Sequence, residues 1–183
     1  MNKAFTRESD FDPAAELSIR PLPVLPPGVK NYITPEGAET LHEELHDLEL
    51  RQRPAVLAEL TRLAEAGLQG EKEHAILRSR RHQLEQQMAL LRERVGSFEV
   101  VEPRTESDGV VRFGDRVRAL DEDGTAHTYV IVGADEADPS SGRISWASPI
   151  GKAFLGAAEG DEVTVQRPRG TAVLEIDEVS PGS

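Results

Sequence analysis

The sequence predicts an α+β protein, in which an N-terminal antiparallel α-helical coiled-coil hairpin is followed by a C-terminal antiparallel-sheet domain. Two observations predict this class. Apolar residues recur at three- and four-residue steps between residues 34 and 95. From residue 98 onward, short runs of β-branched and aromatic residues alternate with turn-forming residues. The 183 residues therefore divide into a leader over 1–29, the hairpin over 30–96 and the sheet domain over 97–183.

Residues 1–29 are predicted to be a disordered, Pro-rich leader. Four prolines fall within the seven residues 21–27. Proline cannot donate a backbone hydrogen bond, and such a run favours extended chain over helix or sheet. A peptide-docking role stays open beside that of a plain flexible leader.

The first helix is predicted over residues 34–66. Thr34 is a good N-cap, and Pro35 suits the first helical position. The apolar stripe is formed by Leu41, Leu45, Leu48, Val56, Leu60 and Leu63. Because Pro54 interrupts this stripe, the segment is either one kinked helix or two shorter ones.

The second helix is predicted to follow a tight turn at residues 67–70 and to run to about Val95, where Gly96 ends it. Its apolar positions are Leu77, Leu84, Met88, Leu91 and Val95. Two helices of similar length joined by a short turn form an antiparallel hairpin.

The sheet domain begins with a short strand over residues 98–101. A hairpin follows, in which residues 117–120 and 127–132 flank a turn at 121–124. Further strands are predicted over 143–146, 163–165 and 172–176. A short helix over 149–155 has Ser148 as its N-cap and Pro149 at its first position.

Composition and charge exclude several classes of function. The formal net charge is −12 and the pI is near 4.9, which argues against a main affinity for bare nucleic acid or an anionic membrane. Cysteine is absent, so disulfides, thiol nucleophiles and Cys-based metal sites are excluded. No apolar run suggests a membrane span or a signal peptide. We expect a cytoplasmic protein that binds no membrane.

The charge is unevenly distributed along the chain. Residues 1–29 carry a net charge of −1, residues 30–95 carry −2, and residues 96–183 carry −9. We expect the acidic C-terminal part to hold a surface that docks on another protein, and the helical part to hold little net charge.

One zinc-binding pattern occurs in the first helix. His42, Glu43 and His46 match H-E-x-x-H, in which two histidines share one helix face and can bind zinc. No third ligand is recognisable, and Leu45 inside the pattern belongs to the apolar stripe. Two interpretations stay open, a zinc hydrolase and an ordinary solvated helix surface. The missing third ligand and the place of Leu45 favour the solvated surface.

The end of the helical hairpin holds charged groups of both signs. Glu65, Glu71 and Glu73 surround the turn, where carboxylates on a rigid rod could bind Mg²⁺ in a remote cavity. Arg78, Arg80 and Arg81 lie just below and could contact nucleic-acid phosphates. An exposed, solvated helix end is the alternative for both groups.

Four stretches resemble the Gre (GreA/GreB) family of bacterial transcription elongation factors, and the whole is nearer to GreB than to GreA. They are residues 30–37 (KNYITPEG), the Arg53-Pro54 pair, the segments 111–117, 121–124 and 129–133, and residues 142–156 (GRISWASPIGKAFLG) followed by 160–163 (GDEV). The last block, in that order and spacing, is the most specific.

The resemblance implies an FKBP-like C-terminal domain that docks on RNA polymerase, and a coiled coil that enters the polymerase secondary channel. The docking residues it implies are Ser148, Pro149, Ile150, Gly151, Lys152, Gly160 and Asp161. In family members that stimulate cleavage, an Asp and a Glu at the tip hold the second catalytic Mg²⁺ of the polymerase, which then cuts backtracked RNA. The factor has no intrinsic cofactor or activity, and nascent RNA is met indirectly, within the elongation complex.

The tip departs from the family pattern, which usually reads G-D-x-S-E-N-A-E/D-Y. Residues 67–74 here are Gly67, Leu68, Gln69, Gly70, Glu71, Lys72, Glu73 and His74. Leucine cannot bind a metal, and a lone carboxylate holds Mg²⁺ less well than a pair. We expect a monomeric regulator with weak or no stimulation of cleavage. The alternatives are an active factor that uses Glu71 and Glu73, and, more distantly, a peptidyl-prolyl isomerase.

Overall fold

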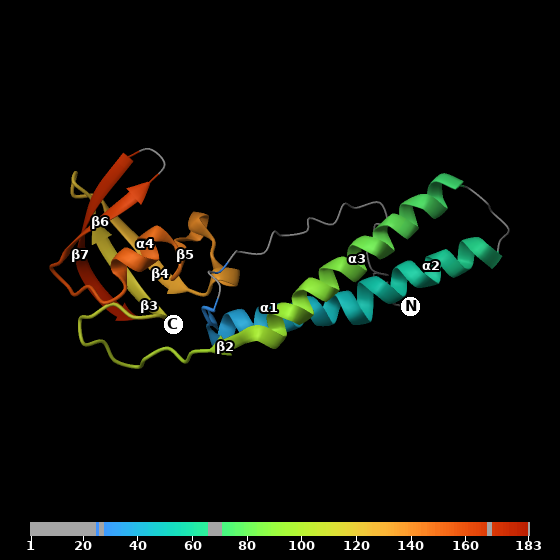
Figure 1. Ribbon diagram of the computed structural model, residues 1–183, viewed down its shortest axis with the longest axis horizontal. Coiled ribbons are helices and arrows are strands. Elements are labelled where there is room, and N and C mark those ends of the chain that lie inside the picture. The colour runs from blue at the N-terminus through green and yellow to red at the C-terminus, as the bar shows by residue number, and fades with distance from the viewer. Residues whose placement is uncertain (1–24, 26–27, 66–70, 168–169, 183) are drawn as a thin grey trace, which may run out of the picture. The chain divides into compact units, whose positions relative to one another are not determined.

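The computed structural model describes residue 25 and residues 28–65, 71–167 and 170–182. These residues form two compact units (Figure 1). One unit contains Leu41–Gly96, and the other contains the described residues of 22–40 together with those of 97–183. A helical N-terminal region and a C-terminal curled sheet confirm the α+β class.

The helical region consists of three α-helices and one π-helical segment within the described residues. They are α1 (Pro35–Asp47), the π-helix η1 (Leu48–Gln52), α2 (Arg53–Glu65) and α3 (Glu71–Ser97). In Figure 1 the ribbon of α3 runs alongside that of α2. Eight residues of the predicted stripes are buried, namely Leu41, Leu48, Val56, Leu63, Leu77, Leu84, Met88 and Leu91. The other three, Leu45, Leu60 and Val95, are only half-buried.

The interruption predicted at Pro54 is confirmed, and it takes the form of a π-helical turn. Pro54 has no N–H to donate to the carbonyl four residues earlier. Immediately before it, the Arg53 N–H donates to the carbonyl of Leu48, five residues back. The Gln52 side chain repeats this spacing, since its Nε2 donates to Asp47 Oδ2 at 2.9 Å. One extra residue is thereby accommodated in the turn before the proline.

The second helix continues two residues beyond the Val95 end that the sequence predicted. Gly96 lies inside α3, and its φ is not in the left-handed range that makes glycine a helix terminator. A Cβ at Gly96 would meet nothing within 4 Å. Gly96 therefore neither caps the helix nor relieves a close contact.

The C-terminal unit is built on a five-stranded sheet with strand order β5-β4-β3-β7-β6. Its strands are β3 (Asp115–Leu120), β4 (Ala126–Val132), β5 (Arg143–Ser145), β6 (Glu162–Arg167) and β7 (Gly170–Pro181). Neighbouring strands are antiparallel except β4 and β5, which are parallel. The predicted hairpin is confirmed, with Gly124 at φ +74° in its turn.

The core of this unit lies between the sheet and α4 (Pro149–Phe154), where Phe154 is fully buried. Two 3-10 turns, η2 (Ala134–Glu136) and η3 (Pro139–Ser141), connect β4 to β5. The buried apolar residues of the core are Val111, Val117, Ala119, Ile131, Ile144, Phe154, Val163, Val165, Leu174, Ile176 and Val179. In the described ranges, no helix is both long enough and apolar enough to cross a bilayer.

The first strand of the chain pairs with a strand that follows the helices. Strand β1 (Asn31–Ile33) pairs in parallel with β2 (Phe98–Val100), and residues 28–40 group with the C-terminal unit. The predicted strand at 98–101 is thus confirmed, but its partner lies more than sixty residues earlier. A parallel pair this far apart in sequence leaves no local pattern, which is why the prediction missed it.

Candidate functional site

The predicted tip residues lie mostly outside what the structure describes. This holds for Gly67, Leu68, Gln69 and Gly70, while Glu71 enters as the first residue of α3 without a described side chain. Glu73 lies in the first turn of α3, and its side chain is exposed. Carboxylates at this end of a helix also interact favourably with the helix dipole. Glu73 is therefore able to reach another molecule and has a structural role as well.

The three arginines below the tip do not form one surface. Arg78 and Arg81 are exposed, and Arg81 faces Glu85 one turn later at 3.7 Å. Arg80, however, is only 8% exposed, and its Nη2 donates to Gln52 Oε1 at 3.4 Å. Burial beside the π-helical turn leaves the Arg80 guanidinium little surface for the phosphate contact that the sequence suggested. The other two remain candidates.

The predicted docking segment forms the start of α4. The Ser148 hydroxyl accepts a hydrogen bond from Gly151 N at 3.1 Å, and Pro149 occupies the first turn, as the sequence predicted for a helix N-terminus. Gly151 is required for close packing, since a Cβ there would lie 2.2 Å from the carbonyl oxygen of Ser145. Ile150 is partly buried against the core, whereas Pro149 and Lys152 are exposed.

The other two docking candidates shape the turn before β6. Gly160 has φ +86°, a conformation that favours glycine, and its N–H donates to the carbonyl of Ile176. Asp161 Oδ2 accepts from Ala158 N at 2.8 Å. Ser148, Gly151, Gly160 and Asp161 therefore each have a structural role, and exposed side chains such as Lys152 are the ones available to a partner.

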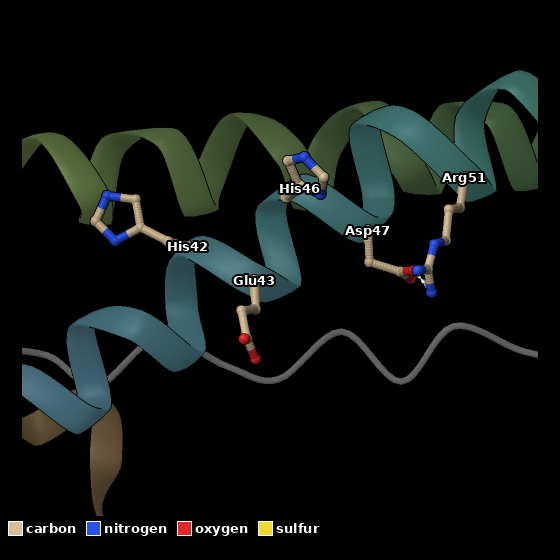
Figure 2. Close-up of a pocket in the computed structure, with 5 residues that line it drawn as sticks. All are labelled: His42, Glu43, His46, Asp47 and Arg51. Carbon is tan, nitrogen blue, oxygen red and sulfur yellow. Dashed lines mark ion pairs between the residues drawn. The ribbon is translucent and has the colours of Figure 1, made fainter.

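The H-E-x-x-H residues lie along one stretch of α1 beside a surface hollow of about 580 Å³. Figure 2 shows the rings of His42 and His46 on one side of the helix, and Glu43 and Asp47 directed to the other. Asp47 pairs with Arg51 at 3.5 Å. Across the part of the chain that is described, no three or more His, Asp or Glu side chains are arranged to hold a metal. The zinc-hydrolase alternative therefore gains no support.

A buried polar cluster centred on Glu136 was missed at the sequence level. The Glu136 side chain is 3% exposed, and its Oε2 accepts from Thr34 N at 2.9 Å and Gly133 N at 2.8 Å. Its Oε1 accepts from the Thr34 hydroxyl and from Arg143 Nη2, the latter at 3.1 Å. Next to it, Asp135 Oδ2 accepts from Asn31 Nδ2 at 2.8 Å, and both residues are buried.

The Glu136 cluster joins the first turn of α1 to the five-stranded sheet of the C-terminal unit. Thr34 is the helix N-cap, as predicted, because its hydroxyl also accepts from Gly37 N at 3.1 Å. The carboxylate of Glu136 satisfies the Thr34 N–H, which would otherwise be buried without an acceptor. The only available signal was local, namely that Thr34 looked like a cap. Its partner lies 102 residues later, which no periodicity reveals.

A second charged network orders the segment before β3. Arg104 Nη1 donates to Asp108 at 2.8 Å, and Arg104 Nη2 donates to the buried carboxylate of Asp115. The hydrogen bond from Arg104, with a further one from Val110 N and the charge of Arg112, lowers the pKa of Asp108 to about 2. Arg104 is thereby held between two carboxylates.

The sequence relatives identify the family. The model of the family described as "Transcription elongation factor, GreA/GreB, C-term" matches residues 106–181. A transcription elongation factor GreA from Desulfovibrio desulfuricans is 39% identical over 150 residues, which cover 81% of this chain and 92% of that protein. The chain belongs to the GreA/GreB family. Gre factors are accessory transcription factors that stimulate cleavage by RNA polymerase, and are not enzymes themselves.

Both names occur among the relatives of this Gre-family chain. A transcription elongation factor GreB from Neisseria meningitidis serogroup B is 36% identical over 149 residues, covering 80% of this chain and 91% of that protein. The crystal structure of GreA factor homolog 1 from Thermus thermophilus is 21% identical, with a TM-score of 0.39, and covers 83% of this chain and 99% of that one. The similar identities do not test the predicted leaning towards GreB.

Proposed function

We propose that this Gre-family factor is a monomer that binds RNA polymerase and inserts its helical hairpin, as a coiled coil, into the polymerase secondary channel. The C-terminal unit, with an FKBP-like fold, docks at the channel rim through the exposed residues around α4. The exposed Lys152 in the last turn of this helix and the ordered turn at Gly160 support this role. The paired apolar stripes of α1, α2 and α3 support the coiled coil.

We further propose that the factor stimulates transcript cleavage weakly or not at all. The observation that carries this proposal is Leu68, which stands in the tip where the family usually has a metal-binding Asp. Glu71 and Glu73 remain, with Lys72 between them. A hydrocarbon side chain cannot bind Mg²⁺, and an adjacent ammonium group opposes the cation, so the polymerase's second Mg²⁺ is held poorly. The ion belongs to the polymerase, and RNA is contacted only within the elongation complex.

The alternative is an active cleavage factor in which Glu71 and Glu73 form the working pair. The exposed side chain of Glu73 in the first turn of α3 favours this alternative. In the sequence, Glu71 and Glu73 are separated by Lys72, whose ammonium group opposes a shared cation. We therefore expect them to share a metal ion less well than the usual Asp–Glu pair.

A cleavage assay on purified, backtracked elongation complexes distinguishes the two. We expect little shortened RNA with the wild-type factor and substantially more with Leu68→Asp. Binding to polymerase is measured in parallel, by competition with a labelled wild-type factor, so that absence of binding is not mistaken for absence of cleavage. Lys152→Glu should weaken binding without altering the tip. Robust wild-type cleavage that disappears in Glu71→Ala would contradict weak stimulation and establish the alternative.

A further inference from the structure

Helix α1 carries two histidines, His42 and His46, to which the proposed transcriptional role assigns no function. His42 and His46 are four residues apart on one α-helix, so they occupy the same face one turn apart, about 5–6 Å between Cβ atoms. Both side chains are exposed and border the same surface hollow. Figure 2 shows both rings on the same side of the helix. An i, i+4 spacing on one helix face is one at which two histidines can bind a single metal ion.

The surroundings of the pair favour a cation. Glu43 and Asp47 lie one position after each histidine and line the same hollow. The cation nearest in sequence, Arg51, is directed to Asp47, with which it forms an ion pair at 3.5 Å. Figure 2 shows both carboxylates directed to the other side of the helix from the imidazoles, so they add negative charge to this stretch of α1 without being ligands of an ion held by the rings.

We propose that His42 and His46 form a two-histidine chelate for a transition-metal ion of the Zn²⁺, Ni²⁺ or Cu²⁺ class, with water in the remaining coordination positions. Imidazole nitrogen suits these ions, whereas Mg²⁺ and Ca²⁺ prefer oxygen ligands. Two protein ligands do not make a hydrolase centre, which takes three, so the site binds metal without catalysis. Because the chelate joins two successive turns, the bound ion stabilises the folded form of α1.

Calorimetric titration of the full chain with ZnCl₂ tests the proposal. We expect the wild type to bind one Zn²⁺. Its affinity for Zn²⁺ should fall at least about tenfold in His42→Ala and in His46→Ala, since changes to residues that only contact a ligand already cost that much. MgCl₂ should produce no comparable binding. The melting temperature of the wild-type chain should rise with ZnCl₂ and return to its starting value with EDTA.

A register variant provides the matched control. Glu44→His combined with His46→Glu keeps composition and charge but places the imidazoles two residues apart, on different faces of the helix. Circular dichroism establishes that each variant is folded. His74→Ala and His82→Ala, on α3, should bind Zn²⁺ like the wild type. The proposal is overturned if the wild type binds no Zn²⁺, if the register variant binds it equally well, or if the α3 variants weaken binding as much as His42→Ala does.

Discussion

Replacing Glu136 by glutamine should strongly destabilise the C-terminal unit, although the two side chains have nearly the same shape and size. The Glu136 carboxylate accepts hydrogen bonds from the Thr34 N–H, the Gly133 N–H, the Thr34 hydroxyl and the Arg143 guanidinium. Glutamine offers one acceptor oxygen and one NH₂ group in the same space. If the NH₂ group takes the Oε2 position, the Thr34 and Gly133 N–H groups both face a donor. If it takes the Oε1 position, the Arg143 guanidinium faces a donor, whereas the Thr34 hydroxyl can turn and accept.

The size of the effect follows from burial. A buried donor that loses its acceptor costs about 1–3 kcal/mol. Arg143 also loses its buried partner, although the exposed Glu36, 3.4 Å from Arg143 Nη1, partly compensates for the lost charge. Loss of one partner from a fully buried ion pair costs about 3–5 kcal/mol, which sets an upper bound. We therefore expect Glu136→Gln to lower the free energy of unfolding by about 2–4 kcal/mol.

Urea unfolding followed by tryptophan fluorescence measures this difference. The single tryptophan, Trp146, packs against Tyr32 of β1 with ring centroids 5.5 Å apart, so it reports on the same part of the molecule. Glu102→Gln is the matched control, because Glu102 is exposed and should change stability by less than about 0.5 kcal/mol. If the two variants unfold at the same urea concentration with the same slope, the Glu136 cluster does not hold this unit together.

Two further predictions use the same unfolding measurement. Gly37→Ala should destabilise the protein by about 1–3 kcal/mol although alanine is the better helix former, because its Cβ would lie 2.2 Å from Glu136 Cδ. Gly96→Ala, with open space around its Cβ, should instead be neutral or stabilising by up to about 1 kcal/mol; equal effects at both positions would refute the contact. Because the pKa of Asp108 is lowered to about 2, its ion pairs stabilise the fold above its ordinary pKa and are lost as the pH falls towards 2. The stability difference between wild type and Asp108→Asn should therefore shrink between about pH 4 and 2, and a constant difference would contradict this.

Features that depend on neighbours in sequence could be predicted. The N-caps at Thr34 and Ser148, the interruption at Pro54 and the hairpin turn at Asp121–Gly124 follow from the hydrogen-bonding capacity of single residues. The apolar stripes also identified most of the residues that are buried in the helical region, although Leu45, Leu60 and Val95 are only half-buried. Each of these predictions needed only a window of a few residues.

Features that depend on distant partners could not be predicted. Glu136 and Thr34 are 102 residues apart, and Asn31 and Asp135 are 104 apart, so nothing near either residue indicates the bond. Arg80 shows the same limit within the helices. Its sequence neighbours suggested a basic surface, but Arg80 is buried and donates a hydrogen bond to Gln52, 28 residues earlier in the π-helical turn.

The same burial changes what the acidity of the C-terminal part means for docking. Residues 96–183 carry a net charge of −9, but Asp115 and Asp135 are buried and the Glu136 side chain is almost completely so. Asp115 pairs with Arg104, and Glu136 with Arg143, so these charges contribute little to the field that a partner meets at the surface. The exposed carboxylates and Lys152 remain to steer a partner. A docking interface on this unit should therefore depend on salt through those surface groups, while substitutions of Asp115 or Glu136 should act on binding only through the stability of the fold.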